Sequence, residues 1–356
     1  MPSNEMRNKF IEQTGLSGDV FEYGDASRSQ VDTMFYTGDD PWHKIGTRLD
    51  KPATAEEAIT QAGLDWEIVQ QPVYYQNEAG NFHEIKGKNA VVRQDTGSVF
   101  YVATERYVPL QNKDAFTFFD GVVGAGEAIY HTAGALREGR LIWILAKLDG
   151  DLGLSGDAAE KYIMLSNSHD GSQSIDMRFC VKRVICKNTY KLALQNKELN
   201  TRIRHTGNVL NKINQTRELL GLSEAYFANF MRGMERLVDK QLTDEESTKF
   251  FEGLVKINRD EPDSVTSRKL NIVRDISDLY YGQGRGSNLG TAKGTAWGAF
   301  NAVSEYSEHH KYIRGATDEL DLIDRRLTSS FFGRGAQLEQ RAWNAALSLT
   351  YDPIRF

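Results

Sequence analysis

The chain has 356 residues, of which 40% are hydrophobic and 26% charged, and its formal net charge is −6. This composition is typical of a globular protein, with two domains the natural division of the length, and it excludes a disordered chain. The acidic total argues against an indiscriminate nucleic-acid coat, and no apolar run has the length of a bilayer span. The first ten residues lack the apolar core of a secretory signal, so we expect a cytoplasmic protein.

Residues 1–40 are polar and rich in glycine and serine, which predicts a loosely packed N-terminal arm. The aromatic residues Phe35, Tyr36 and Trp42 interrupt this pattern. Such residues dock either on a neighbouring subunit or back on their own domain. Beyond the arm, Thr54 followed three residues later by Glu57 forms a capping-box pattern, which predicts a short helix that stops at Gly63.

From Trp66 onward the apolar residues recur with period two, and β-branched and aromatic residues dominate, as in a half-buried antiparallel meander. A helix is expected from Asn112 to Gly124 and a loop at 149–160, and the stretch 188–197 is interpreted as a helix that covers the sheet. The strands are expected at 66–75, 82–87, 89–110, 127–136, 140–148, 161–167 and 174–186.

Beyond Gly207 the apolar residues recur at helical intervals, and Thr243 begins another capping pattern. Helices are expected within 208–242 and at 243–257, 264–281, 295–306 and 335–349. The predicted fold class is therefore α+β, with a mostly antiparallel β-meander sheet and packed helices, followed by an all-helical C-terminal region. The predicted domains are the arm at 1–40, an α+β sheet domain at 41–206 and a helical domain at 207–356.

A cationic island is the main electrostatic feature of the sequence. Between Arg178 and Arg204 there are eight lysines and arginines and only one acid, Glu198. Several cations along one track suit a phosphate backbone, and an exposed aromatic ring among them can stack on a base. The alternative is a solvated face whose cations pair with acids elsewhere. The candidate nucleic-acid-binding residues are Arg178, Lys182, Arg183, Lys187, Tyr190, Lys191, Arg202 and Arg204.

Other motifs predict no chemistry. The glycine cluster at 282–298 fails the phosphate-loop pattern because Lys293 precedes Gly294, so we interpret it as a loop between helices. The segment around His169 and Asp170 is typical of a turn, although a hydrolase acting through it stays a weaker alternative. We expect no cofactor and no metal site. Cys180 and Cys186 are too few for a disulfide framework, and we expect them to be small buried hydrophobic residues.

Several segments, in this order, resemble a family of uncharacterised phage- and plasmid-encoded proteins, and the resemblance covers roughly residues 40–345. The segments are GLDWEIVQQPVYY, NAVVRQDTGSVFYVATERYVPLQNKDAFTFFD, YIMLSNSHDGS, VKRVICKNTYKLAL, IRHTGN and GTAWGAFNAVSEY. The resemblance implies a mobile genetic element in a bacterial cell and carries no established activity. In outline, the predicted architecture is similar to the RecT-like, Erf-like and Redβ-like single-strand annealing proteins of phages, which is an analogy of fold.

Two hypotheses follow. The first is an oligomeric, ring- or filament-forming protein that binds single-stranded DNA in phage or plasmid recombination without catalysing a reaction. Its cations would neutralise the backbone and release counterions, so that complementary strands approach each other. The second is a structural or host-interaction protein that self-assembles or binds a protein partner. Neither hypothesis involves a membrane, and nothing in the sequence supports an enzyme.

Overall fold

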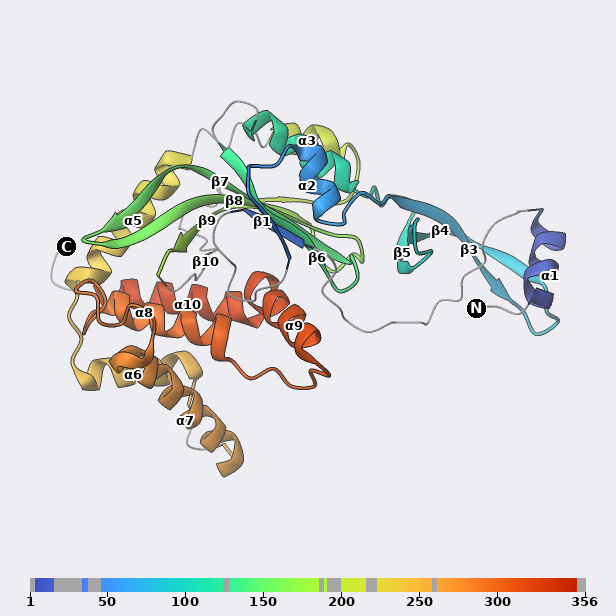
Figure 1. Cartoon of the computed structure of the whole chain (residues 1–356). Helices are drawn as coiled ribbons and strands as arrows, with labels where there is room; N and C mark the ends of the chain where they lie inside the picture. The colour runs from blue at the N-terminus through green and yellow to red at the C-terminus, as the bar shows by residue number, and fades with distance from the viewer. Residues whose placement is uncertain are drawn as a thin grey trace.

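The structure is a computed structural model that describes residues 4–15, 34–37, 46–123, 128–185, 189–190, 200–215, 223–257 and 261–350. Mostly antiparallel strands occupy the N-terminal half of the chain and helices the C-terminal part, which confirms the predicted α+β class (Figure 1). The strands are β1 (Met34–Thr37), β2 (Thr47–Leu49), β3 (Ile68–Gln76), β4 (Phe82–Arg93), β5 (Val99–Thr104), β6 (Ala128–Leu136), β7 (Leu141–Leu154), β8 (Asp157–Ser168), β9 (Ile175–Arg183), β10 (Thr189–Tyr190) and β11 (Asn200–Ile203).

The helices follow the capping signals of the sequence where these are present. Thr54 and Thr243 each form a complete capping box at the start of α2 and α6. The helices are α1 (Asn4–Thr14), α2 (Ala55–Gln61), α3 (Asn112–Val123), α4 (Val209–Gln215), α5 (Ser223–Asp239), α6 (Asp244–Val255), α7 (Asp263–Asp278), α8 (Ala296–Glu305), α9 (Glu319–Phe332) and α10 (Arg334–Ser348), with π-helical turns η3 (Leu279–Gln283) and η4 (Tyr306–His310).

The main sheet has the strand order β10-β9-β8-β7-β6-β1-β2, and β11 also pairs with β9. The chain crosses it as a meander from β6 to β9, because short turns join successive antiparallel strands. Strands β1 and β2 pair in parallel, and all other strand pairs among the described residues are antiparallel. Strands β10 and β11 pair with different parts of β9, so together they form one interrupted edge of the sheet.

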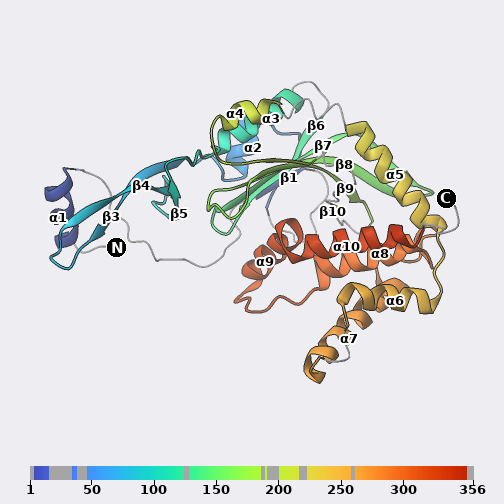
Figure 2. The same cartoon turned by 180° about the vertical axis from the view of Figure 1, so that it is seen from behind.

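The main sheet lies between two helical layers (Figure 1). Strand β7 begins with the continuous apolar run Leu141–Ala146, and all six side chains are buried, as expected for a strand that is covered on both faces. Ile142 and Ile144 belong to the large core that includes residues of α2 and α3, whereas Leu141 and Trp143 pack with Ile323 and Leu327 of α9. Figure 2 shows α5 at the end of the sheet.

The strands β3, β4 and β5 form a separate three-stranded sheet. The outer parts of β3 and β4 pair only with each other among the described residues, and this two-stranded ribbon projects from the body with α1 at its tip (Figures 1 and 2). Phe10 of α1 makes edge-to-face contacts with Tyr74 and Phe82 of the ribbon, with ring centroids 5.0 and 5.2 Å apart. Apart from the pairing of β3 with β4 and the contacts with α1, little in the described structure stabilises the outer part of the ribbon.

Four expectations require correction. The stretch 149–160, expected as a loop, lies mostly in β7 and β8, joined by a turn at Ser155 and Gly156. Thr189 and Tyr190 form a strand where a helix was expected, and the following residues 191–197 lie outside the described residues. Helix α9 was not predicted. The stretch 1–40 contains α1 and β1, and Phe35 is fully buried in the chain's own core; Trp42 lies outside the described residues.

Candidate functional site: the cationic island and its surroundings

Strand register decides where the cations of the island lie. Arg178 and Lys182 are four residues apart on β9, so they share one face of the sheet, and Arg183 points to the opposite face. Arg202 of β11 pairs with Asp176, which is on the same face as Arg178. Burial then alternates from Arg202 to His205, since Arg202 and Arg204 are exposed and Ile203 and His205 are buried. Arg178, Lys182, Arg202 and Arg204 therefore form one row.

The two β9 members of this row already have anionic partners. Arg178 forms an ion pair with Asp176, and burial lowers the pKa of its guanidinium. The Lys182 ammonium lies 3.9 Å from Glu160, whose carboxylate also accepts a 2.6 Å hydrogen bond from the Tyr162 hydroxyl. These contacts fit the alternative in which the cations pair with internal acids.

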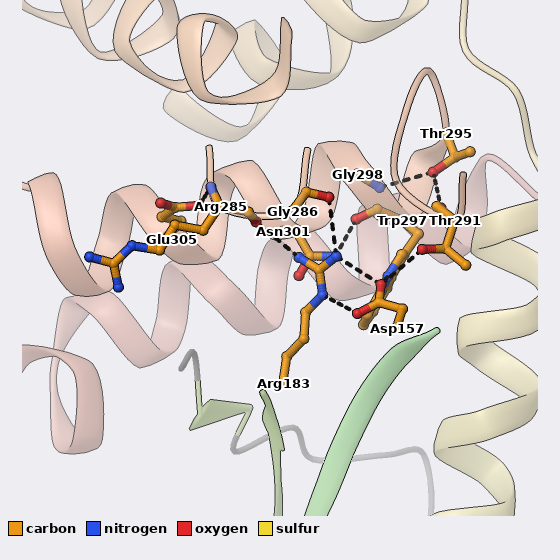
Figure 3. A network of polar contacts seen from close by, with 10 residues as sticks. All are labelled: Asp157, Arg183, Arg285, Gly286, Thr291, Thr295, Trp297, Gly298, Asn301 and Glu305. Atoms are coloured by element: carbon orange, nitrogen blue, oxygen red, sulfur yellow. Dashed lines mark hydrogen bonds and ion pairs between the residues drawn. The ribbon is translucent and has the colours of Figure 1, made fainter. Parts of the chain in front are cut away.

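Arg183 is not available to a phosphate. Its side chain is 1% exposed and donates two hydrogen bonds to Asp157, of 2.6 and 2.7 Å. The Asp157 carboxylate also accepts hydrogen bonds from Thr291 Oγ1 at 3.0 Å and from Trp297 Nε1 at 2.9 Å (Figure 3). The guanidinium of Arg183 is thus held inside the protein by Asp157, and this geometry does not support the prediction that Arg183 contacts nucleic acid.

The same network accounts for the glycine cluster at 282–298. The carbonyl oxygens of Arg285 and Gly286 lie 3.5 Å from Arg183 nitrogens, and the Arg285 N–H donates to Glu305 (Figure 3). A Cβ on Gly286 would lie 2.8 Å from Ile185, so the loop approaches the end of the sheet closely. The glycines thus allow the loop to pack tightly against the end of the sheet. This arrangement fits the interpretation of the cluster as a loop between helices.

The structure does not describe the side chains of the remaining candidate residues of the island. Lys187 and Lys191 are outside the described residues, as is Cys186, and only the backbone of Tyr190 is described. Cys180 is fully buried, as expected of a small hydrophobic residue.

Cations that the sequence analysis did not single out lie near Arg202 and Arg204. The segment 104–108 runs beside 204–206, since Val108 N donates to His205 O and Tyr107 bridges to Thr206. Lys88 pairs with Thr104, and the Lys212 ammonium donates to Thr206 O at 2.8 Å. We call the five exposed cations of this region the edge patch: Lys88, Arg106, Arg202, Arg204 and Lys212.

The edge patch is electrostatically different from the β9 cations. None of its five members forms an ion pair with a described residue, and Glu105 is the exposed acid within the 104–108 segment. Lys88 and Arg106 are far from the island in sequence, so only strand pairing reveals them. The patch therefore presents unneutralised positive charge to solvent.

The turn around His169 is a structural element. His169 is fully buried, its Nε2 lies 3.0 Å from Asn112 Oδ1, and burial lowers the pKa of its imidazole to about 3. Ser168 donates to Asp170, which also accepts from Ser172 N and pairs with Arg137. A neutral histidine without solvent contact does not reach a substrate, so this geometry fits a turn that is anchored to α3.

Within the part of the chain that the structure describes, no group of histidine, cysteine, aspartate and glutamate side chains has the arrangement of a metal site. In the same ranges, none of the helices combines the length and apolarity needed to span a bilayer.

Comparison with protein families gives one result. Residues 99–329 match the model of a family described as Domain of unknown function (DUF932). Searches of curated proteins and of solved structures give no significant match. The family match spans well over half of the chain, so the chain belongs to the DUF932 family.

Proposed function

We propose that this DUF932 protein binds single-stranded DNA through the edge patch and acts as an oligomer in the recombination of a phage or plasmid. Binding is electrostatic: lysines and arginines neutralise phosphates and release counterions. No catalytic step is involved. The observation that carries the proposal is the pair Arg202, on the edge strand β11, and Arg204, just after its end; both are exposed and have no ion-pair partner among the described residues.

The spacing of this pair supports an extended polyanion. Two residues along a strand advance by about 6.6 Å, which is comparable to the step between phosphates in an extended single strand. Arg106, Lys88 and Lys212 continue the positive surface beside β11. A track of this kind contacts the backbone and reads no base sequence, as an annealing protein requires.

The projecting ribbon supports the oligomeric part of the proposal. Outside the body, β3 and β4 expose Tyr75 (52%) and Ile85 (39%), and a two-stranded ribbon with exposed apolar side chains is marginally stable alone. Contact with a neighbouring copy would cover these side chains. The same observation also supports the second hypothesis, a protein that self-assembles without nucleic acid.

The test compares two double variants with equal charge change. Arg202→Gln/Arg204→Gln alters the edge patch, and Arg268→Gln/Arg274→Gln removes two exposed arginines of α7. Affinity for a fluorescently labelled oligothymidylate is measured by anisotropy over a range of salt concentrations. We expect the slope of log affinity against log salt to fall by about 1.4 in the edge-patch variant, and to change much less in the control.

Equal slopes in the two variants would show that binding is diffuse or lies elsewhere. Arg183 remains unchanged in this experiment, because its loss would disturb the fold. Negative-stain images of the protein with and without the oligonucleotide test the oligomer. A ring or filament that forms only with DNA supports the proposal, whereas assembly without any DNA binding supports the protein-assembly alternative.

A further inference from the structure

A cavity of about 550 Å³ lies between α6 and α10, far in sequence from the edge patch. Phe250, Leu254 and Leu349 form its apolar part, and Lys256, Arg341 and Asn344 are among its polar lining residues. A volume of this size, mainly apolar with a few polar groups, is typical of a site for an organic ligand. Three lining cations, Lys249, Lys256 and Arg341, outnumber the single lining acid, Glu246, so the cavity favours a ligand that carries negative charge.

Helix α10 extends this positive surface beyond the cavity. Arg334 and Arg341 are exposed and seven residues apart, so they lie on one helix face with a rise of about 10.5 Å between them. Burial, followed by the charges of these two arginines, lowers the pKa of Lys311. Among the described residues, none of the three cations has a carboxylate within ion-pair distance.

Two acids that follow Lys311 in sequence, Asp318 and Asp321, are engaged elsewhere. Asp318 accepts a hydrogen bond from the Asp321 N–H at the start of α9, and Asp321 pairs with Arg325 at 2.6 Å. The repulsion among Lys311, Arg334 and Arg341 is therefore not relieved by these neighbours. An anion from outside would relieve it.

An aromatic side chain lies next to this cluster. Tyr312 is 80% exposed, the highest value among the large hydrophobic residues that the structure describes as exposed. It follows Lys311 directly, and Arg314 comes two residues later. Exposed tyrosines beside cations are a common platform for stacked bases, because every base offers an aromatic face whatever its sequence.

We propose that this surface is a second binding site for single-stranded nucleic acid, with phosphates along α10, one base on Tyr312 and another base in the cavity. We call it the α10 track: Lys256, Lys311, Tyr312, Arg314, Arg334 and Arg341. The inference shares its ligand with the proposed function but rests on different residues. It adds a C-terminal contact to the edge of the sheet, so one protein molecule holds a strand, or two strands, at two places.

An acidic peptide shares the negative charge of the ligand, but Tyr312 and the cavity favour a ligand that also has planar apolar groups. Nucleic acid alternates charged and planar groups along its length, as this surface does. Loss of the Tyr312 ring should weaken the binding of nucleic acid but not that of an acidic peptide, so an experiment can distinguish the two ligands.

The experiment uses the full chain, a fluorescently labelled oligothymidylate and three variants: Tyr312→Ala, Tyr312→Phe and Arg334→Gln/Arg341→Gln. We expect Tyr312→Ala to weaken binding roughly 5- to 150-fold, because base stacking is lost, and Tyr312→Phe to bind as the unchanged protein does. The arginine variant should reduce the salt slope by about 1.4. Thermal unfolding of each variant verifies that it is folded.

The failures of the two proposals are distinguishable. Unchanged affinity and slope in all three variants, with binding still lost in Arg202→Gln/Arg204→Gln, overturn the α10 track and leave the edge patch standing. Loss in the α10 variants alone supports the track and removes the edge patch. If labelled oligoglutamate, and not the oligonucleotide, binds in a manner that depends on Arg334 and Arg341, the occupant is an acidic peptide and the proposal is overturned.

Discussion

The buried ion pair between Asp157 and Arg183 allows a quantitative test of the structural role assigned to Arg183. In Asp157→Ala, the guanidinium loses both of its hydrogen bonds to the carboxylate while it stays 1% exposed, and Thr291 and Trp297 each lose an acceptor. Removing one partner of a buried pair costs about 3–5 kcal/mol of stability. This is a large part of the roughly 5–15 kcal/mol that holds a typical protein folded.

The assay is urea unfolding followed by circular dichroism at neutral pH. Glu245→Ala is the control, because its partner Lys249 and Glu245 itself are 71% and 77% exposed, and surface pairs contribute about 0–1 kcal/mol. Replacing both buried charges, as in Asp157→Leu/Arg183→Met, should restore much of the loss. If Asp157→Ala costs no more than Glu245→Ala, the reasoning about this network is refuted.

Two further predictions concern packing and pH. A Cβ on Gly298 would lie 1.9 Å from the carbonyl oxygen of Ala292, so Gly298→Ala should destabilise the fold by about 1–3 kcal/mol. A Cβ on Gly290 meets no atom within 4 Å, so Gly290→Ala should lower the thermal unfolding temperature much less. Equal effects of the two substitutions would contradict this packing. Burial, followed by the charge of Lys182, lowers the pKa of His131 to about 3. Protonation therefore favours the unfolded chain, and the free energy of unfolding falls as the pH drops below about 6.5. Between pH 7 and 5, His131 should lower the free energy of unfolding by roughly 2 kcal/mol, as measured by urea unfolding at both pH values. In His131→Gln the decrease between these pH values should be smaller by this amount, and an unchanged decrease would mean that His131 is not buried in its neutral form.

Local signals in the sequence were sufficient for most elements of the fold. The capping boxes at Thr54 and Thr243 depend on residues three apart, so the sequence contains all the required information. Helix α9 was missed although a signal is present: Asp318 caps its first turn, and Ile323 and Leu327 are buried four residues apart. An aspartate N-cap before apolar residues at helical spacing predicts such a helix as a threonine cap does.

The candidate site was predictable only in part, because long-range pairing decides it. Period two along 174–186 indicates a strand and separates Arg183 from Arg178 and Lys182. The partners of Arg183 are Asp157 and the loop around Gly286, and no local pattern connects them. Arg106 joins the edge patch only because segment 104–108 runs beside 204–206. Charge density along a sequence therefore identified a cationic region but not which cations reach solvent.

Hydrogen–deuterium exchange of the full chain, with and without a saturating oligothymidylate, tests DNA binding at the edge patch most directly. We predict slower amide exchange in β11 and in residues 104–108 when the oligonucleotide is present, because the bound strand lies across both segments. Unchanged exchange in both segments under conditions where the oligonucleotide is bound would contradict the proposed interface, and no binding at all would contradict the proposed function.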